Sequence, residues 1–246
     1  MTPYFSIVIP TLNEARYLPK LLNCLKHQTN QDFEVTIVDA NSSDSTLLEA
    51  AKFRPKLPFL TVMTTSKKNV SYQRNLGAKK SHGKIILFID ADSQLPPFYL
   101  DGLKYKLQKN PAGVFTTWIK ADSQNPQDVA IATIINLAFE TSRFLDIPTG
   151  FGAMLGFTHQ AFRHLKGFNT SITYAEDQEV IRRCLQLKLK FVIYPDPQYT
   201  YSLRRVRQQG SLQSLRQFIK LQTKVLTNGY SVDAKKDYPM GGHHFN

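Results

Sequence analysis

The chain has 246 residues, of which 42% are hydrophobic and 11% aromatic. That composition is enough for a substantial core and excludes an intrinsically disordered protein. Lys and Arg outnumber Asp and Glu by 31 to 19, a formal net charge of +12, which favours nucleic acid, nucleotide phosphates or an anionic membrane surface without choosing among them.

The first half alternates strand and helix patterns. Leucines at 18, 21, 22 and 25 repeat at helical spacing, a second helix begins near Leu47, and a third is expected at 71–81, ended by Gly83. FSIVIP at 5–10 is a continuous apolar run, typical of a strand buried on both faces of a parallel sheet. Three further strands are expected in FEVTIVD at 33–39, FLTVMTT at 59–65 and KIILFID at 84–90. Strands separated by helices predict right-handed crossovers and a Rossmann-like, doubly wound, mostly parallel α/β sheet flanked by helices.

The second half is less regular. We expect a strand near 112–119, an apolar helix near 128–145, a short strand GAMLGF at 152–157, a helix from 176, a strand KFVIYP at 190–195 and a basic amphipathic helix at 211–227. Neither an internal repeat nor a Ser/Gly-rich linker interrupts this pattern. The sequence therefore predicts a single domain over residues 1–228 and a C-terminal tail at 229–246.

Polar residues follow three of the predicted strands. The first strand ends in PTLNE at 10–14, the second in Asp39 with NSSD at 41–44, and the fourth in DAD at 90–92. Because open parallel sheets bind ligands at the carboxyl ends of their strands, we expect a site at this edge. For Asp44, capping of the following helix is an equally good interpretation.

Asp90 and Asp92 stand one residue apart at a strand end, so their side chains point to the same side. Mg²⁺ and Mn²⁺ prefer oxygen ligands, commonly one or two carboxylates plus substrate phosphates, and Gln94 adds an amide oxygen. A lone D-x-D pattern is common in turns. With Asp39 and Arg74 upstream, it predicts a metal–diphosphate site.

Three further features carry charge. Arg74 lies on a helix whose Gly77 and Ala78 allow close packing, and its guanidinium suits a diphosphate. The cluster Arg204, Arg205 and Arg207 fits a phosphate clamp on a mobile loop better than a nucleic-acid patch, because aromatic residues are not interleaved with it. Glu176 and Asp177 begin a helix, where acids favour the helix dipole but where a rigid turn also suits a general base.

Taken together, PTLNE, VDANSSDST, QRNLGA, DADSQ, GFN at 167–169, EDQE and SLRRVRQQG resemble the family 2 inverting glycosyltransferases with the GT-A fold, over about residues 5–227. The resemblance implies a nucleotide-binding half at about 1–95 and an acceptor half at about 96–228. It implies a nucleotide pocket lined by Pro10, Asn13, Glu14 and Asp39. Further donor contacts would come from Arg74, Asp90, Arg204 and Arg205. Mn²⁺ or Mg²⁺ would be held by Asp92, Asp90 and Gln94, Asp177 would be the catalytic base, and Glu176 and Gly152 would contact the acceptor.

The DADSQLPP stretch is also similar to polyprenyl-phosphate mannosyltransferases, whose phosphate acceptor is already ionised. The paired acids of EDQE favour an acceptor hydroxyl instead, because a hydroxyl must lose a proton. The RRVRQQG stretch is similar to small bacterial members of the family, and the absent QxxRW box argues against polymerisation. We expect metal-dependent transfer from a UDP- or GDP-linked sugar to a glycan or lipid-linked acceptor in cell-envelope glycan biosynthesis.

Other activities compete with this interpretation. A polyprenyl-phosphate glycosyltransferase is the nearest alternative. A nucleotidyltransferase would usually carry a Gly-rich basic loop after the first strand, where this chain has TLNEARY. Nucleic-acid binding would account for the charge but not for acids at three strand ends, so no nucleic-acid partner is expected.

Two segments suggest contact with a membrane. The N-terminus lacks the pattern of a signal peptide, and no apolar run reaches the roughly 18–20 residues of a span, so a cytoplasmic protein is expected. VAIATIINLAF at 129–139 is too short to cross a bilayer, and its burial on the sheet is favoured over interfacial contact. The helix at 211–227 sets Arg216, Lys220 and Lys224 beside an apolar stripe, which fits packing or peripheral binding at the inner face of the membrane equally well.

Overall fold

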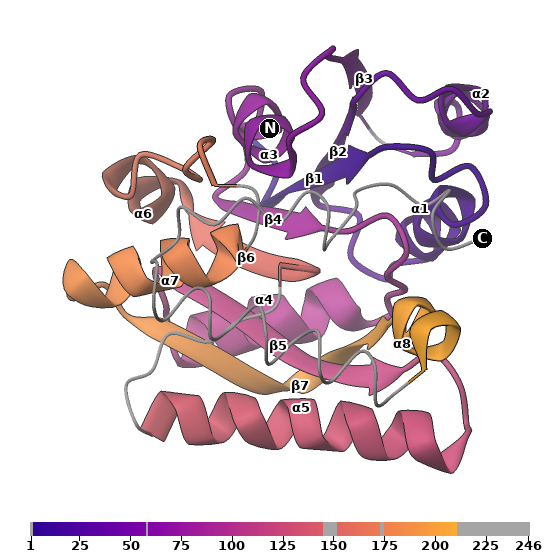
Figure 1. The fold of residues 1–246 in the computed structure, drawn as a ribbon. Coiled ribbons are helices and arrows are strands. Elements are labelled where there is room, and N and C mark those ends of the chain that lie inside the picture. The colour runs from indigo at the N-terminus through magenta and orange to yellow at the C-terminus, as the bar shows by residue number, and fades with distance from the viewer. Residues whose placement is uncertain (1, 58, 145–151, 173–174, 211–246) are drawn as a thin grey trace.

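One seven-stranded mixed sheet forms the centre of the molecule (Figure 1). The computed structural model describes residues 2–57, 59–144, 152–172 and 175–210. The strand order is β3-β2-β1-β4-β6-β5-β7, and only β6 runs antiparallel to its neighbours β4 and β5. The strands are β1 (Phe5–Thr11), β2 (Phe33–Asp39), β3 (Leu60–Thr64), β4 (Ile85–Ile89), β5 (Val114–Ala121), β6 (Met154–Thr158) and β7 (Phe191–Tyr201). The predicted α/β class and mostly parallel sheet are confirmed.

Helices connect the strands and flank the sheet. They are α1 (Leu18–Lys26), α2 (Thr46–Ala51), α3 (Val70–Ala78), α4 (Tyr99–Lys109), α5 (Pro126–Phe144), α6 (His159–His164), α7 (Glu176–Gln186) and α8 (Arg204–Gln209). The helix expected at 211–227, the boundary at 228 and the tail at 229–246 lie outside the described residues.

Side chains from alternate positions of the strands enter two cores. Phe5, Ile7 and Ile9 of β1 pack with leucines of α1 and α4. Val8 of β1 and Phe88 of β4 point to the other face and pack with α6 and α7. Both faces are therefore covered at β1, as its continuous apolar run predicted (Figure 1), whereas the edge strand β3 is only partly buried.

Helix α3 lies very close to the strand β1. A Cβ atom added at Gly77 would come 2.3 Å from Cγ1 of Val8, which confirms that this glycine allows the close approach. The expected end of the helix at Gly83 is wrong, because α3 ends at Ala78. Gly83 instead passes β1 so closely that a Cβ there would lie 2.7 Å from the carbonyl carbon of Phe5.

Helix α5 packs on the sheet along one side only. Ala132 and Phe139 are buried, and the Asn136 side chain both accepts from the amide and donates to the carbonyl of Ile119 in β5, each at 2.9 Å. On the opposite side, Ile134 and Leu137 are 64% and 57% exposed. The expected burial therefore holds for one half of its circumference. Within the described part of the chain, no helix combines the length and hydropathy needed to span a bilayer.

Candidate active site

The polar strand ends meet where the strand order reverses. From β1 the chain proceeds to β2 and β3 on one side, then returns to β4 on the other side of β1. The carboxyl ends of β1 and β4 therefore flank the switch point, the usual ligand position in such sheets. Antiparallel β6 begins at the same edge, where the Asp90 amide donates to the Ala153 carbonyl at 2.9 Å. The predicted convergence of these strand ends is present.

Asp39 and Asn13 build one wall of this edge. The Asp39 carboxylate is fully buried and accepts hydrogen bonds from the Thr11 hydroxyl at 2.9 Å and from the Ser42 amide at 2.8 Å and hydroxyl at 2.5 Å. The Ser42 hydroxyl accepts in turn from the Asn13 amide at 2.8 Å. Asn13 and Asn41 have φ values of 55° and 60°, a left-handed conformation that asparagine tolerates. Asp39 thus holds the turn that shapes the wall.

The neighbouring loop carries Glu14, and Pro10 is buried in β1 before it. The Glu14 amide donates to the Thr46 hydroxyl at 2.8 Å. Asp44 accepts from the Thr46 amide at 3.0 Å and from the Ala15 amide at 3.1 Å. Asp44 therefore contacts the start of α2 and ties it to the loop after β1, whereas the N-cap position itself is Ser45, without a side-chain capping hydrogen bond.

The two acids of the DAD stretch bind different arginines. Asp90 pairs with Arg74 at 3.0 Å, whereas Asp92 pairs with Arg204 at 3.1 Å. Arg204 also donates to Glu14 at 3.0 Å, and its guanidinium lies over the Tyr17 ring at 4.1 Å. The end of β7 is thereby tied to the loop after β1.

The arginine cluster does not lie on a mobile loop as predicted. It forms the short helix α8, and Arg204 is only 7% exposed. Burial raises the pKa of Asp92 to about 6, and the guanidinium groups of Arg204 and Arg205 oppose that rise. Arg207 instead pairs with Asp122 at 2.6 Å and Asp128 at 2.8 Å, on a different part of the surface.

Arg74 links the two halves of the molecule. Its side chain is 2% exposed and donates to Asp90 at 3.0 Å, to the Gly152 carbonyl at 2.8 Å and to Glu176 at 2.7 Å. The hydrogen bonds of the Arg74 guanidinium thus go to the side chains and backbone of other residues of this chain. In this arrangement Arg74 positions acids of both halves, and a diphosphate would have to compete with them for its guanidinium.

Asp177 lies beside this bridge on the first turn of α7. Its carboxylate accepts from the Gly152 amide at 2.6 Å and from the Gln178 amide at 2.8 Å. Burial and the neighbouring Glu176 raise the pKa of Asp177 to about 7, while Arg74 opposes the rise. The predicted base and the two predicted acceptor residues, Glu176 and Gly152, therefore form one cluster.

The loop at 90–94 after β4, called the acid loop below, has side chains that suit a divalent cation if phosphate or water supplies further ligands. No group of three or more His, Cys, Asp or Glu side chains suited to a metal is found among the described residues, so Asp92 would need ligands from phosphate or water. Burial also raises the pKa of nearby Glu14 to about 7 although Arg204 opposes the rise, so the guanidinium groups at this edge do not offset the burial of Asp92 and Glu14. Among the described residues, the buried polar atoms around Asp92 that lack a hydrogen-bond partner include Ser93 Oγ, Tyr199 Oη and both Nη1 and Nε of Arg204, although Nε lies 3.1 Å from the Asp92 carboxylate. The raised pKa values of Asp92 and Glu14 fit a hard cation at Asp92, whereas the unpaired Nη1 of Arg204 is a donor that suits a phosphate.

The other two predicted metal ligands, Asp90 and Gln94, have different partners from Asp92. Asp90 is engaged by Arg74, as described above. Gln94 pairs with Thr200 of β7 through its backbone, its amide donating to the Thr200 carbonyl at 3.0 Å.

Two contributors to the site were not predicted from the sequence. Gln73 is 1% exposed, and its side-chain amide donates to the carbonyls of Thr11 at 2.9 Å and Val38 at 2.7 Å, joining the ends of β1 and β2. The Tyr17 ring packs against the Arg204 guanidinium at 4.1 Å. Neither stands out in the sequence, although Gln73 adjoins Arg74 in the QRNLGA motif.

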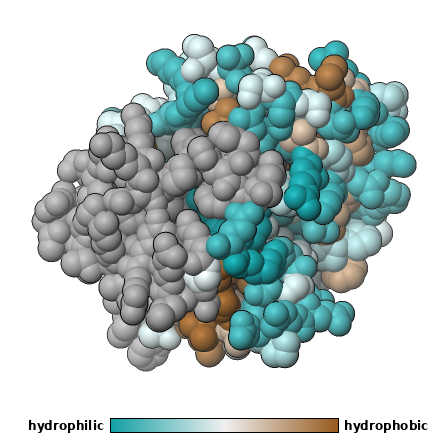
Figure 2. Space-filling model, turned by 45° about the vertical axis from the view of Figure 1, so that its right-hand side comes forward, coloured by the Kyte–Doolittle hydropathy of each residue, from teal (hydrophilic) through white to brown (hydrophobic). Residues whose placement is uncertain are grey.

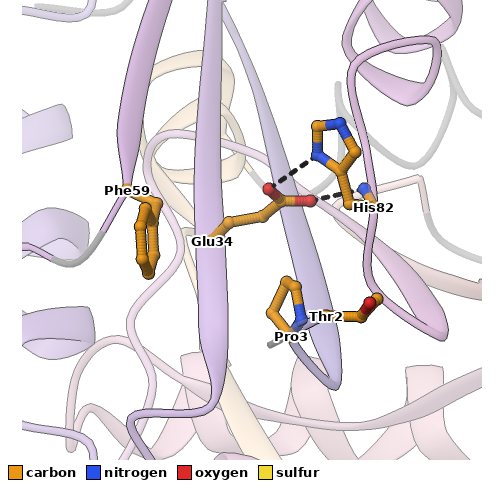
Figure 3. Close-up of a pocket in the computed structure, with 5 residues that line it drawn as sticks. All are labelled: Thr2, Pro3, Glu34, Phe59 and His82. Carbon is orange, nitrogen blue, oxygen red and sulfur yellow. Dashed lines mark hydrogen bonds and ion pairs between the residues drawn. The ribbon is translucent and has the colours of Figure 1, made fainter.

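A separate pocket of about 380 Å³ lies at the opposite edge of the sheet (Figure 3). It is lined by Thr2, Pro3, Glu34, Phe59 and His82, which lie at or before the amino ends of strands. Glu34 accepts there from the His82 ring at 3.1 Å. The carboxylates of the switch point are at the other edge, so this pocket is not part of the candidate active site.

Comparison with known proteins identifies relatives. The model for glycosyl transferase family 2 matches residues 6–166. A PGL/p-HBAD biosynthesis glycosyltransferase of Mycobacterium bovis (strain BCG / Pasteur 1173P2) is 40% identical over 94 residues, covering 38% of this chain and 37% of that protein. Poly(ribitol-phosphate) beta-N-acetylglucosaminyltransferase TarS of Staphylococcus aureus (strain Mu50) is 35% identical over 94 residues, covering 37% of this chain and 16% of that protein. The chain thus spans well under two thirds of either relative.

Solved structures show the same fold. S. aureus TarS 1–349 in complex with UDP-GlcNAc superposes with a TM-score of 0.64 at 23% identity, covering 80% of this chain and 58% of that chain. The mannosyltransferase PcManGT of Pyrobaculum calidifontis in complex with GDP-Man and Mn²⁺ gives a TM-score of 0.67 at 21% identity, with coverages of 89% and 65%. The family match also decides against a nucleotidyltransferase. This chain belongs to glycosyl transferase family 2 and has the GT-A fold.

Proposed function

We propose that the protein is an inverting, metal-dependent glycosyltransferase that moves a sugar from a nucleoside-diphosphate donor to a hydroxyl group of a glycan or lipid-linked acceptor. The observation that carries this proposal is the cluster at the start of α7. There Asp177 accepts from the Gly152 amide at 2.6 Å, and Arg74 ties its neighbour Glu176 to Asp90 of the acid loop. A base for the acceptor thus stands beside a site for the donor phosphates.

The donor would lie along the loops after β1 and β2. The wall built by Asn13 and Asp39, with Pro10 and Glu14 beside it, is assigned to the nucleoside, and Arg204 with Arg205 to the diphosphate. Structures of the same fold hold UDP-GlcNAc and GDP-Man, which supports a uridine or guanosine donor. Because three protein groups already bond the buried Asp39 carboxylate, its role would be to hold the wall.

A divalent cation, Mn²⁺ or Mg²⁺, would be held by Asp92, with Asp90 and Gln94 in the same loop. When bound, it would supply positive charge for the leaving diphosphate. The PcManGT structure with Mn²⁺ supports this assignment.

In the proposed reaction, Asp177 takes the proton of the acceptor hydroxyl as that oxygen bonds to the anomeric carbon. The bond from this carbon to the diphosphate oxygen breaks at the same time, and its electron pair leaves with the diphosphate. Attack opposite to the leaving group inverts the configuration. Arg204 and Arg205 stabilise the departing charge.

The acceptor is assigned to the hydroxyl class because of the base. General base catalysis works best when the pKa of the base lies near the working pH, and burial brings the pKa of Asp177 to about 7. A polyprenyl phosphate acceptor, the alternative, is already ionised and would need no such group.

The test is a transfer assay with UDP- and GDP-sugars, Mn²⁺ or Mg²⁺, and hydroxyl-bearing or phosphate-bearing lipid and glycan acceptors. We expect a product of inverted anomeric configuration by NMR, formed on hydroxyl acceptors and lost with EDTA. A retained anomer would reject the mechanism. Full turnover in EDTA would reject the metal site, and transfer only to phosphates would select the alternative.

A further inference from the structure

Asn75 lies next to Arg74 on α3 and makes a two-bond clamp on a distant loop. Its side-chain amide donates to the Phe168 carbonyl at 2.8 Å, and its side-chain oxygen accepts from the Phe168 amide at 2.9 Å. The fit is close, since a Cβ atom at Gly167 would lie 2.5 Å from the Asn75 oxygen. Gly167 also has a φ of 72°, a conformation that favours glycine.

The clamped residue supports Arg74. Phe168 is 3% exposed and packs edge-on against Phe88 at 5.0 Å between ring centroids. The Arg74 guanidinium lies over the Phe168 ring at 5.3 Å. Because this ring is fixed by the core below and by the clamp at its backbone, it defines where the guanidinium can rest.

The same loop is tied to the helix that carries the proposed base. Arg183 of α7 donates to the Gly167 carbonyl at 2.8 Å and to the Leu165 carbonyl. Glu179, which is 5% exposed, holds Arg183 with bonds of 2.7 and 2.8 Å. The loop at 165–168 therefore joins α3, with Arg74, to α7, with Glu176 and Asp177.

We propose that Asn75 is a positioning residue for catalysis: by clamping Phe168, it fixes Arg74 in its bridge between Asp90 and Glu176 and so sets the placement of the first turn of α7. This inference rests on the proposed function. Asn75 contacts none of Asp90, Glu176 and Asp177 through a hydrogen bond in the described structure and acts through Arg74 and the loop.

A matched control is present elsewhere in the molecule. Asn136 makes the same pair of bonds to one backbone residue, Ile119, at 2.9 Å each. Asn136→Ala removes an equivalent clamp without touching the loop at 165–168. Asn75→Asp is a second variant that keeps the acceptor for the Phe168 amide but replaces the donor to the Phe168 carbonyl with an anionic oxygen.

The first experiment is an unfolding cycle that needs no substrate. Glu176→Gln is introduced into the wild type, Asn75→Ala, Asn75→Asp and Asn136→Ala, and the midpoint of thermal unfolding is measured. If Asn75 sets the bridge, Glu176→Gln lowers the midpoint less in either Asn75 variant than in the wild type, and equally in Asn136→Ala and the wild type. Additive effects for Asn75 would overturn the proposal.

The second experiment measures steady-state kinetics of the same single variants. We expect Asn75→Ala to lower kcat by about 10- to 100-fold, the scale of a displacement near 1 Å, with little change in KM for the donor, and Asn136→Ala to leave kcat unchanged. Coupling in the cycle with an unchanged kcat would show that the clamp serves only the fold. An inactive wild type would reject the proposed function, and the cycle would still decide whether Asn75 sets the bridge.

Discussion

Asp177 is held in a position where its two protonation states are close in free energy. Burial and the adjacent Glu176 favour the neutral acid, whereas Arg74 and the amides of Gln178 and Gly152 favour the carboxylate. An ordinary surface aspartate would be ionised and too weakly basic to take a proton well at neutral pH. The balance between burial and these neighbouring groups, and not the residue type alone, therefore sets the pKa of Asp177.

Replacement of Asp177 by Asn tests its proposed role as the base. The change keeps the size of the side chain and removes the proton acceptor, so we expect kcat to fall by about 10²- to 10⁴-fold, the usual contribution of general acid–base catalysis. Affinity for the nucleotide sugar, measured by calorimetry, should stay within experimental error. A collapse of donor affinity would move Asp177 into the donor pocket.

The pH dependence follows from the same group. Because only the ionised form accepts a proton, kcat/KM should rise with pH through about 7, where the pKa of Asp177 lies. The folded pKa is raised above the unfolded one, so the folded state binds more protons between about pH 4 and 7. The contribution of Asp177 to stability is therefore present at low pH and lost as the pH rises through about 7.

Stability measurements can check that sign. The Asp177→Asn variant should lack this decline, so its unfolding midpoint relative to the wild type should increase from pH 5 to pH 8. A difference that is flat across this range would contradict the raised pKa.

At the scale of elements, the packing of α3 against β1 determines where Arg74 and Asn75 point. Gly77 lets the helix axis come close to the strand, as the 2.3 Å approach of a Cβ there to Val8 shows. The two polar residues on the preceding turn are carried to the end of the sheet by this contact. A wider spacing would withdraw both from the site.

Gly77→Ala tests this contact. Overpacking typically costs about 1–3 kcal/mol, which should exceed the roughly 1 kcal/mol that alanine gains over glycine in a helix, so the free energy of unfolding and the activity should both fall. Gly102→Ala in α4 is the control, because its Cβ would lie 3.3 Å from Pro197 and should perturb stability less. Equal effects in chemical denaturation would mean that the α3–β1 contact can relax.

Helix α5 presents an apolar side to solvent. Val129, Ile134 and Leu137 are 47%, 64% and 57% exposed, at spacings that place Ile134 and Leu137 on one stripe. The face shown in Figure 2 is mostly hydrophilic, with hydrophobic residues in several separate patches. We propose that this stripe lies in the membrane interface when the enzyme meets a lipid-linked acceptor.

Co-sedimentation with liposomes tests that proposal. At about 0.1 M salt, where contact-range attraction persists, we expect the protein to bind anionic vesicles more than neutral ones. Ile134→Ser with Leu137→Ser should weaken binding, whereas Leu48→Ser, which changes a residue 69% exposed on α2, should not. Equal, negligible binding of the wild type to both vesicle types would reject membrane contact.

At the scale of the whole molecule, a few buried charges join the proposed donor side of the sheet to the proposed acceptor side. Arg74 and Arg204 reach across from α3 and α8 to acids of other elements. The formal net charge of +12 suits the proposed nucleoside-diphosphate donor, which is anionic.

Thermal shift measurements test this organisation with ligands. UDP and GDP are each added with and without Mn²⁺. We expect one of the two nucleotides to raise the unfolding midpoint, and to do so only when the metal is present. A ligand at 100 times its Kd adds about 2.7 kcal/mol to the free energy of unfolding. Asp92→Asn should remove the metal-dependent part of the shift. A shift of equal size without Mn²⁺ would show that the nucleotide binds without the cation.

The sequence determined the sheet and the edge that carries the site. Apolar runs such as Phe5–Thr11 and Ile85–Ile89 are typical of strands buried on both faces of a sheet, and both strands are fully buried here. Acids and amides directly after such strands must lie at their carboxyl ends, so the convergence of Asn13, Asp39 and Asp90 follows from connectivity. Gly77 could likewise be assigned to a close contact before its partner was known.

Only the tertiary structure decided how these charges are paired. Asp90 and Asp92 are two positions apart, yet one binds Arg74 and the other Arg204, because the partners arrive from α3 and α8 over sequence separations that no local pattern encodes. The same holds for the Asn75 clamp on Phe168, 93 residues away, and for the one-sided packing of α5. Pairing between side chains that are distant in the sequence depends on distances that are set only when the chain has folded.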